Sequence, residues 1–120
     1  MDSKSTMSGT IEAYVTFLSP SEGGRSQPAV DSKQYRPHIV IGDPRMRSPV
    51  PDSALWGAED YLGVSFGGSG RTLQPGKLHH VRMIRLYEPK VNYDAVVPGA
   101  TFTIREGGRI VGCGVVATRR

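Results

Sequence analysis

The sequence contains a single cysteine, Cys113, so no disulfide can form within the chain, and a cytoplasmic location is expected. It has no apolar run long enough to cross a bilayer, so no membrane association is expected either. Residues 1–10 are polar and lack the apolar centre of a signal peptide. We therefore expect residues 1–10 to form a loose tail and residues 11–120 to form one folded domain.

Residues for metal or nucleophilic chemistry are also scarce. His79 and His80 are adjacent, so on a strand they point to opposite faces, and His38 is the only other histidine. No metal site and no cofactor are therefore expected. Cys113 lies between glycines in an apolar run, which favours a buried, inert thiol over a nucleophile. No catalytic residue is predicted, and the chain is not expected to be an enzyme.

A phosphate-binding loop is missing as well. The dipeptide Gly76-Lys77 is the nearest match, but Arg71 stands where the first glycine of such a loop belongs. Leu78 follows the lysine in place of the hydroxyl residue that binds magnesium. Neither nucleotide binding nor GTP hydrolysis is expected. The adjacent carboxylates at 59–60 are expected to be solvated on a loop.

The composition is that of a turn-rich globular domain. Glycine (15) and proline (9) are frequent, which favours many turns over long helices. Lys and Arg number 15 against 11 Asp and Glu, and the net charge of +4 permits an acidic partner without requiring one.

Six segments have the alternating or β-branched apolar pattern of strands. They span residues 11–18, 38–41, 61–66, 79–88, 101–106 and 110–116. In the longest, 79–88, the alternation slips near Met83, which indicates either a bulge or two partly covered faces. The proline-rich connection 42–59 is expected to be held to the body by Leu55 and Trp56. Six strands with frequent turns and no confident helix predict a small closed barrel or a sandwich.

The segment 101–116 is predicted to be a β-hairpin. Only Gly107 and Gly108 separate its two strands, and two glycines can both adopt the positive φ of a type I′ turn. Gly112 and Gly114 carry no side chain, which suits a strand that another backbone approaches closely.

The tetrapeptide Glu-Gly-Gly-Arg occurs twice, at 22–25 and at 106–109. Because the flanking residues differ, two independent turns are favoured over an internal duplication. If the two turns meet in space, four arginines could form a basic patch with Tyr35 and Tyr14 as stacking partners. These arginines are Arg25, Arg36, Arg105 and Arg109.

Residues 11–118 resemble the third domain of translation elongation factor Tu. The hairpin sequence 103–116 is similar to the C-terminal end of that factor. Further matching segments occur in the same order: Tyr14 to Leu18 with the first Glu-Gly-Gly-Arg, Tyr35-Arg36-Pro37, Gln74-Pro-Gly76 and Leu86-Tyr-Glu-Pro89. The resemblance implies a six-stranded antiparallel β-barrel. In the family this domain packs on the GTPase domain, touches the T-stem of aminoacyl-tRNA and meets elongation factor Ts.

The resemblance also implies positions for RNA or partner contacts. They are Arg25, Ser26, His38, Glu106 and Gly107. Ser26 stands where the family often has histidine, and His38 replaces the glutamine that follows Tyr-Arg-Pro. Two extra residues precede that motif, and the segment 42–59 replaces the family's own connection.

Two functions from different classes are therefore expected. The first is a non-enzymatic binding module, without a GTPase domain in its 120 residues, that binds tRNA or a translation factor. The alternative is a barrel reused for an unrelated regulatory or inhibitory protein–protein contact through the connection 42–59.

Overall fold

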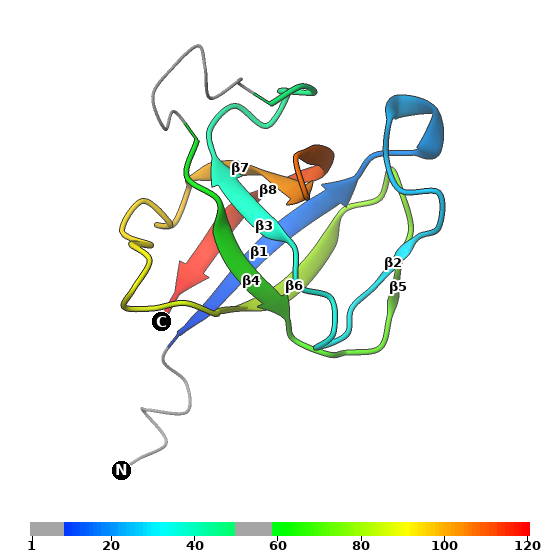
Figure 1. Ribbon diagram of the computed structural model, residues 1–120. Helices are drawn as coiled ribbons and strands as arrows, with labels where there is room; N and C mark the ends of the chain where they lie inside the picture. Colours follow the sequence, from blue (N-terminus) through cyan, green and yellow to red (C-terminus); the bar gives the residue numbers. More distant parts are fainter. Residues whose placement is uncertain (1–8, 50–58) are drawn as a thin grey trace.

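Six antiparallel strands close into a barrel in the order β1-β6-β4-β3-β7-β8 (Figure 1). The computed structural model describes residues 9–49 and 59–120. The barrel strands are β1 Thr10–Phe17, β3 His38–Ile41, β4 Leu62–Phe66, β6 His79–Arg85, β7 Thr101–Glu106 and β8 Arg109–Arg119. The predicted all-β, six-stranded antiparallel barrel is confirmed, and the alternative of a sandwich is not what forms.

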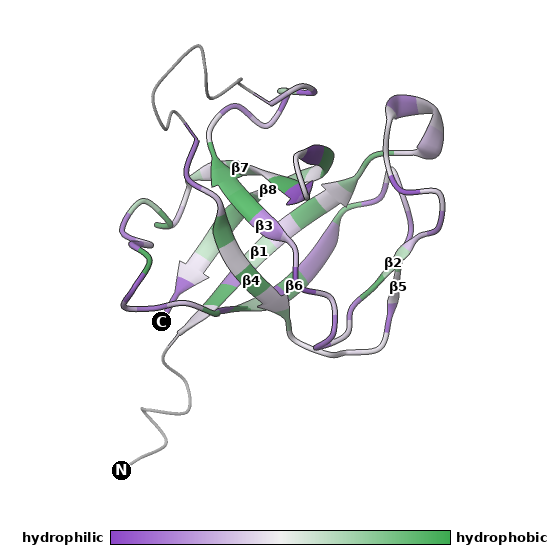
Figure 2. Cartoon of the chain, viewed as in Figure 1, coloured by the Kyte–Doolittle hydropathy of each residue, from purple (hydrophilic) through white to green (hydrophobic). Residues whose placement is uncertain are grey.

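The barrel interior is filled by the apolar side of each strand. On β1 the inward side chains are Ile11, Ala13, Val15 and Phe17, all of them buried as their alternation predicts. Apolar side chains from the other five strands meet them, and Figure 2 shows green segments along the barrel strands. Burial of this interior supplies the main force that holds the closed sheet together.

Two short strands were not predicted. β2 (Ala29–Val30) and β5 (Thr72–Leu73) pair with each other as a separate two-stranded sheet beside the barrel (Figure 1). Each has only two residues, which is too few to show a period-two pattern in the sequence. A single turn of 3-10 helix, η1 (Pro20–Glu22), follows β1.

The slip in the alternation of β6 is not a bulge. Its register runs without interruption against β1 and against β4. Val81 and Met83 point inward and are buried, while Ile84 lies on the outer face and is partly covered. β6 ends at Arg85 instead of Glu88, and the longest strand is β8, with 11 residues.

The bulges lie in β8. Its register shifts opposite Ile104/Arg105 on β7, where Val111 has no register partner on that strand, and opposite Glu12/Ala13 on β1. Such bulges increase the local twist of a strand, which helps a long strand to follow the curve of a closed barrel.

The hairpin between β7 and β8 is confirmed, but its predicted turn type is wrong. Gly107 has a φ of 61°, whereas Gly108 does not adopt a left-handed φ. A positive φ at the first of the two central residues, and not at the second, is typical of a type II′ turn. This turn type also matches the twist of the strands.

Because only Gly107 has a positive φ, the two glycines of the turn should differ in how well they tolerate substitution. We expect Gly107→Val to lower the free energy of unfolding by about 1–3 kcal/mol, because a β-branched residue is strained at positive φ. Gly108→Val serves as the matched control, since no atom lies within 4 Å of a Cβ placed there. Chemical denaturation of both variants tests this, and equal losses would contradict the turn assignment.

At its N-terminal side, the barrel begins slightly before residue 11, the predicted start of the domain. Gly9 donates its N–H to the carbonyl of Arg120, and Thr10 already belongs to β1. The rest of the expected tail, residues 1–8, lies outside the described residues, as do Leu55 and Trp56.

Candidate functional site

The two Glu-Gly-Gly-Arg turns lie against each other at one end of the barrel. Arg25 of the first turn donates from Nη1 to Oε2 of Glu106, which ends β7. Arg109, which begins β8, donates from Nη2 to the carbonyl oxygen of Gly24 at 3.0 Å. Each turn thus supplies an arginine to the other. We call this cluster, together with Tyr35, the junction.

β1 and β8 bring the first turn to this position. Their pairing continues past the end of β1, because Leu18 donates its N–H to the carbonyl of Val111 at 2.9 Å. The chain then reverses through η1, and Gly24 donates its N–H back to the carbonyl of Ser19 at 2.9 Å. Arg25 therefore leaves the turn beside the start of β8.

The two copies of the tetrapeptide have different local structures. Glu22 caps η1 by accepting hydrogen bonds from the N–H and the hydroxyl of Ser19, at 3.0 and 2.9 Å. These hydrogen bonds lower the pKa of Glu22. Glu106 instead reaches across to Arg25. The difference supports two independent turns rather than a duplicated unit.

Tyr35 completes the junction from the segment before β3. Its hydroxyl donates to Oε2 of Glu106 at 2.7 Å, and the guanidinium carbon of Arg25 lies 5.3 Å from the centre of its ring. Ring contacts with Phe17 and Phe66 hold the tyrosine in place. Burial and the hydrogen bond to Glu106 raise the pKa of Tyr35 well above its ordinary value, so it remains a neutral donor at physiological pH.

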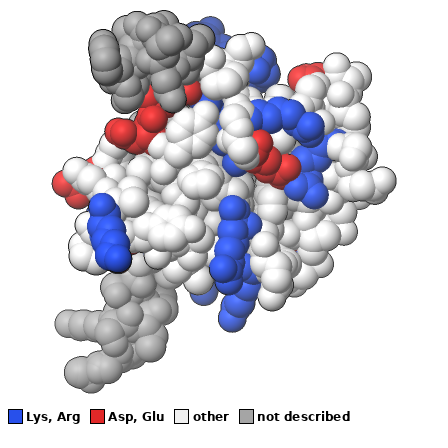
Figure 3. Space-filling model, in the orientation of Figure 1, with Lys and Arg blue, Asp and Glu red and all other residues white. Residues whose placement is uncertain are grey.

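The junction carries one negative and two positive charges. Burial disfavours the charged form of Arg25, but the carboxylate of Glu106 outweighs this and raises the pKa of the guanidinium. Both side chains of the pair retain about 30% exposure, and Arg109 is exposed. Basic side chains on the face in Figure 3 form separate groups with acidic ones beside some of them. The surface therefore suits a few directed contacts better than a broad electrostatic footprint.

The structure brings together four of the five predicted contact residues. Arg25 and Glu106 pair directly, Ser26 is exposed beside Arg25, and Gly107 is exposed at the tip of the hairpin. His38 lies on β3 opposite Arg105, and its ring is 5.8 Å from that of Tyr61.

The predicted basic patch is only partly formed. Arg25 and Arg109 meet at the junction, whereas Arg36 donates from Nε to the carbonyl of Lys33 at 3.3 Å and joins neither. Arg105 is fully buried on the outer face of β7, so the expectation that it contributes to an exposed patch is wrong.

Arg105 instead forms a buried ion pair that the sequence did not reveal. Its two terminal nitrogens donate to both carboxylate oxygens of Glu59 at 3.0 and 2.9 Å. The hydroxyl groups of Tyr61 and Thr103 also lie 2.9 Å from guanidinium nitrogens. Glu59 was expected to be solvated, and this is wrong because its side chain retains only 5% exposure. The pair fastens one end of the connection 42–59 to the barrel wall.

Cys113 faces the outside of β8, opposite Thr16 and Thr103, and is partly buried. Burial raises the pKa of its thiol, which keeps it protonated at neutral pH and supports the expectation of an inert side chain. Within residues 9–49 and 59–120, no three His, Cys, Asp or Glu side chains converge to hold a metal ion.

The sequence matches no known protein-family model. In the part of the chain that the structure describes, no helix has the length and hydropathy needed to span a bilayer.

Proposed function

We propose that this protein is a non-enzymatic binding module, similar to the third domain of elongation factor Tu, that binds tRNA or a protein component of translation. The supporting observation is the reciprocal contact of the two Glu-Gly-Gly-Arg turns. Arg25 reaches Glu106, and Arg109 reaches the backbone of Gly24. The two turns thereby present one surface, as an RNA contact through both of them requires.

The junction offers the chemistry for an RNA backbone. Within the part of the chain that the structure describes, Arg25 and Arg109 each use one terminal nitrogen and keep the other for a phosphate oxygen. Among the described residues, Glu106 accepts hydrogen bonds from Arg25 and Tyr35 at Oε2, which leaves Oε1 to accept from a ribose 2′-hydroxyl. A contact to that hydroxyl distinguishes RNA from DNA.

The segment around Gly76, which comes closest in sequence to a phosphate-binding loop, supports a role without nucleotide hydrolysis. Gly76 has a φ of 77° in the turn between β5 and β6, and its N–H donates to the carbonyl of Phe17 at 3.0 Å. That amide is therefore committed to the protein. The following residues enter β6 rather than the helix on which a phosphate loop depends.

We expect Arg25→Ala to weaken tRNA binding for all sequences alike and to lower the salt slope by about one charge. The wild-type dissociation constant is expected to be of about micromolar order or weaker, because the net charge is only +4. Titration of labelled tRNA at two salt concentrations measures both quantities. Arg45→Ala is the control, because it removes the same charge from a side chain outside the junction. Arg45 is exposed and pairs with Asp43.

Glu106→Ala should weaken RNA binding more than binding to a DNA of the same shape, because the 2′-hydroxyl acceptor is lost. Part of the loss will be shared with DNA, since the variant also releases Arg25 and Tyr35. An absence of binding at low salt, or equal effects of the Arg25 and Arg45 variants, would contradict RNA binding at the junction.

The alternative function, a protein contact through the connection 42–59, has one supporting observation. Glu59 is fixed to Arg105, so the connection returns to the barrel at a rigid point. Replacing residues 50–58 with a Gly/Ser linker while keeping Glu59 tests this function without breaking the ion pair. Loss of a captured protein in this variant, with capture unchanged in Arg25→Ala, would favour the alternative over the junction.

A further inference from the structure

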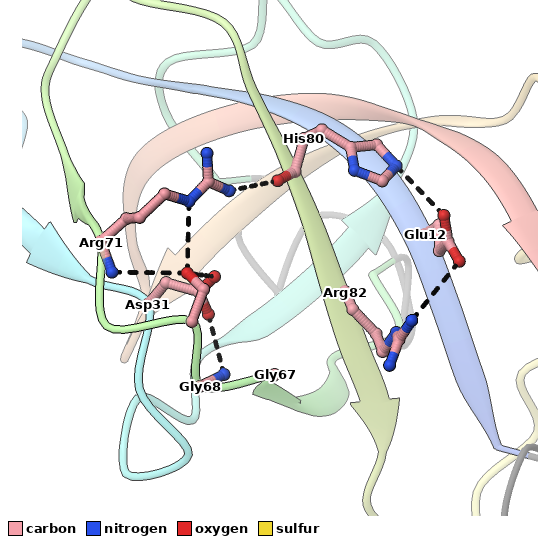
Figure 4. A pocket seen from close by; sticks show the side chains of 8 residues that line it. Glu12, Asp31, Gly67, Gly68, Arg71, His80 and Arg82 are labelled. Carbon is pink, nitrogen blue, oxygen red and sulfur yellow. Dashed lines mark hydrogen bonds and ion pairs between the residues drawn. The ribbon is translucent and has the colours of Figure 1, made fainter.

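A second polar site lies on the barrel wall, away from the junction. It is a hollow of about 300 Å³ between strands β1 and β6 and the loop that leads into β5 (Figure 4). Its polar lining consists of Glu12, Asp31, Ser69, Arg71, His80 and Arg82. We call it the β1–β6 pocket.

The strand register places the side chains of this pocket. Glu12 pairs with Arg82, and Tyr14 pairs with His80, across the antiparallel ladder. Because Ala13 between them points into the core, these four side chains share the outer face. Cross-strand neighbours on one face are the closest contacts that a sheet provides, so the two pairs form a compact group.

Both acidic side chains of the pocket have partners within the protein. Asp31 is buried, and its carboxylate accepts from the N–H of Gly68 and the hydroxyl of Ser69. Glu12 lies 3.1 Å from Nε2 of His80. Asp31 therefore fixes the loop, and Glu12 fixes the histidine on the strand next to it.

The two arginines keep donors for a ligand. Arg71 is oriented by hydrogen bonds from Nη2 to the carbonyl of His80 at 2.6 Å and from Nε to Ser69 at 3.3 Å. Its Nη1 has no hydrogen-bond partner among the described residues, and Figure 4 shows it directed away from both of these contacts. Arg82 approaches Glu12 only to 4.0 Å and is 56% exposed.

An exposed aromatic pair adjoins these cations. The Tyr14 ring centre lies 5.0 Å from that of His80, and Tyr14 retains 42% exposure on the outside of the barrel. A tyrosine so exposed offers one face of its ring to a flat partner. Aromatic rings beside arginines in a groove are the combination that holds unpaired bases together with their phosphates.

We propose that the β1–β6 pocket binds single-stranded nucleic acid. One base stacks on Tyr14 beside His80, and the adjoining phosphates contact Arg71 and Arg82. The pocket shares no residue with the junction, so this inference does not depend on the proposed function. The ring faces favour a nucleic-acid strand over a phosphopeptide, which would use the arginines alone.

The probe is a labelled single-stranded oligouridylate, titrated at low and moderate salt and followed by fluorescence anisotropy. Tyr14→Ala should weaken binding by about fivefold to a hundredfold, the range for one stacked base, while Tyr14→Phe should retain it. Arg82→Ala should lower the salt slope by about 0.7. Arg45→Ala serves as the control that should leave the affinity nearly unchanged.

Competition separates single strands from other phosphate ligands. An RNA duplex of the same length and free uridine monophosphate should both compete poorly, because neither combines an accessible base with neighbouring phosphates. The inference is overturned by an absence of oligouridylate binding at low salt, by equal competition from the duplex, or by binding of a phosphopeptide in place of the oligonucleotide. Binding that is lost in Arg25→Ala but kept in Tyr14→Ala also overturns it and assigns the strand to the junction.

Discussion

Glu59→Ala is expected to lower the free energy of unfolding by about 3–5 kcal/mol, because it leaves the buried guanidinium of Arg105 without its counter-ion. The Arg105 side chain is completely buried, and both of its terminal nitrogens donate to Glu59. The remaining partners among the described residues, the hydroxyls of Tyr61 and Thr103 and the sulfur of Met46, are neutral and cannot replace the lost charge. Denaturant titration of the variant measures the loss.

Two controls separate this effect from a general loss of surface charge. Asp43→Ala removes an exposed carboxylate from its pair with Arg45 and should leave the melting temperature unchanged. The double variant Arg105→Met/Glu59→Met replaces the pair with apolar side chains and should recover most of the stability. If Glu59→Ala unfolds at the same denaturant concentration as the wild type, the pair does not fasten the connection 42–59 to the barrel.

Gly114→Ala is expected to destabilise the protein by about 1–3 kcal/mol, and Gly114→Val by more. A Cβ at this position would lie 2.5 Å from the carbonyl oxygen of Tyr14 and 2.6 Å from Cζ of Phe102. One of these neighbours belongs to the backbone of β1, so the clash cannot be relieved by a side-chain rotation alone. The melting temperature should fall by roughly 5–20 °C for the alanine variant.

The matched control is Gly108→Ala, which adds the same methyl group where no atom lies within 4 Å. It should melt close to the wild type. Gly112→Ala is expected to lie between the two, because its Cβ would be 2.8 Å from the carbonyl oxygen of Thr16. A Gly114 variant as stable as the Gly108 variant would show that β1 and β8 are further apart than described.

The positions of the barrel strands could be predicted because their apolar residues alternate with polar ones or form short apolar runs. β1 shows the alternation most clearly, with one buried and one less buried face, whereas β4 and the centre of β7 are buried on both faces. The Gly107 turn was located correctly, but two adjacent glycines permit either primed turn, so the sequence alone could not decide between types I′ and II′. The strands β2 and β5 depend on pairing with each other across more than forty residues, which leaves no local signal.

The candidate site could be predicted only in part, because its contacts also join residues that are far apart in the sequence. The repeated Glu-Gly-Gly-Arg marked both turns, but only the fold shows that Arg25 meets Glu106. Tyr35 was noted as a stacking partner, and its hydrogen bond to Glu106 became visible only in three dimensions. The burial of Arg105 had no sequence signal, because its partner Glu59 is 46 residues away and stands in a stretch that reads as a solvated loop.

The most direct test of the junction as a binding surface is a pull-down from cell lysate, with and without nuclease, using the wild type and the double variant Arg25→Ala/Arg109→Ala. The wild type should capture tRNA or a translation protein. Captured tRNA should be removed by nuclease, whereas a directly captured protein should remain after nuclease treatment. The double variant should lose either partner while keeping its fold. Capture that is unchanged by the double variant, or no enrichment of tRNA or translation proteins by the wild type, would contradict the proposed function.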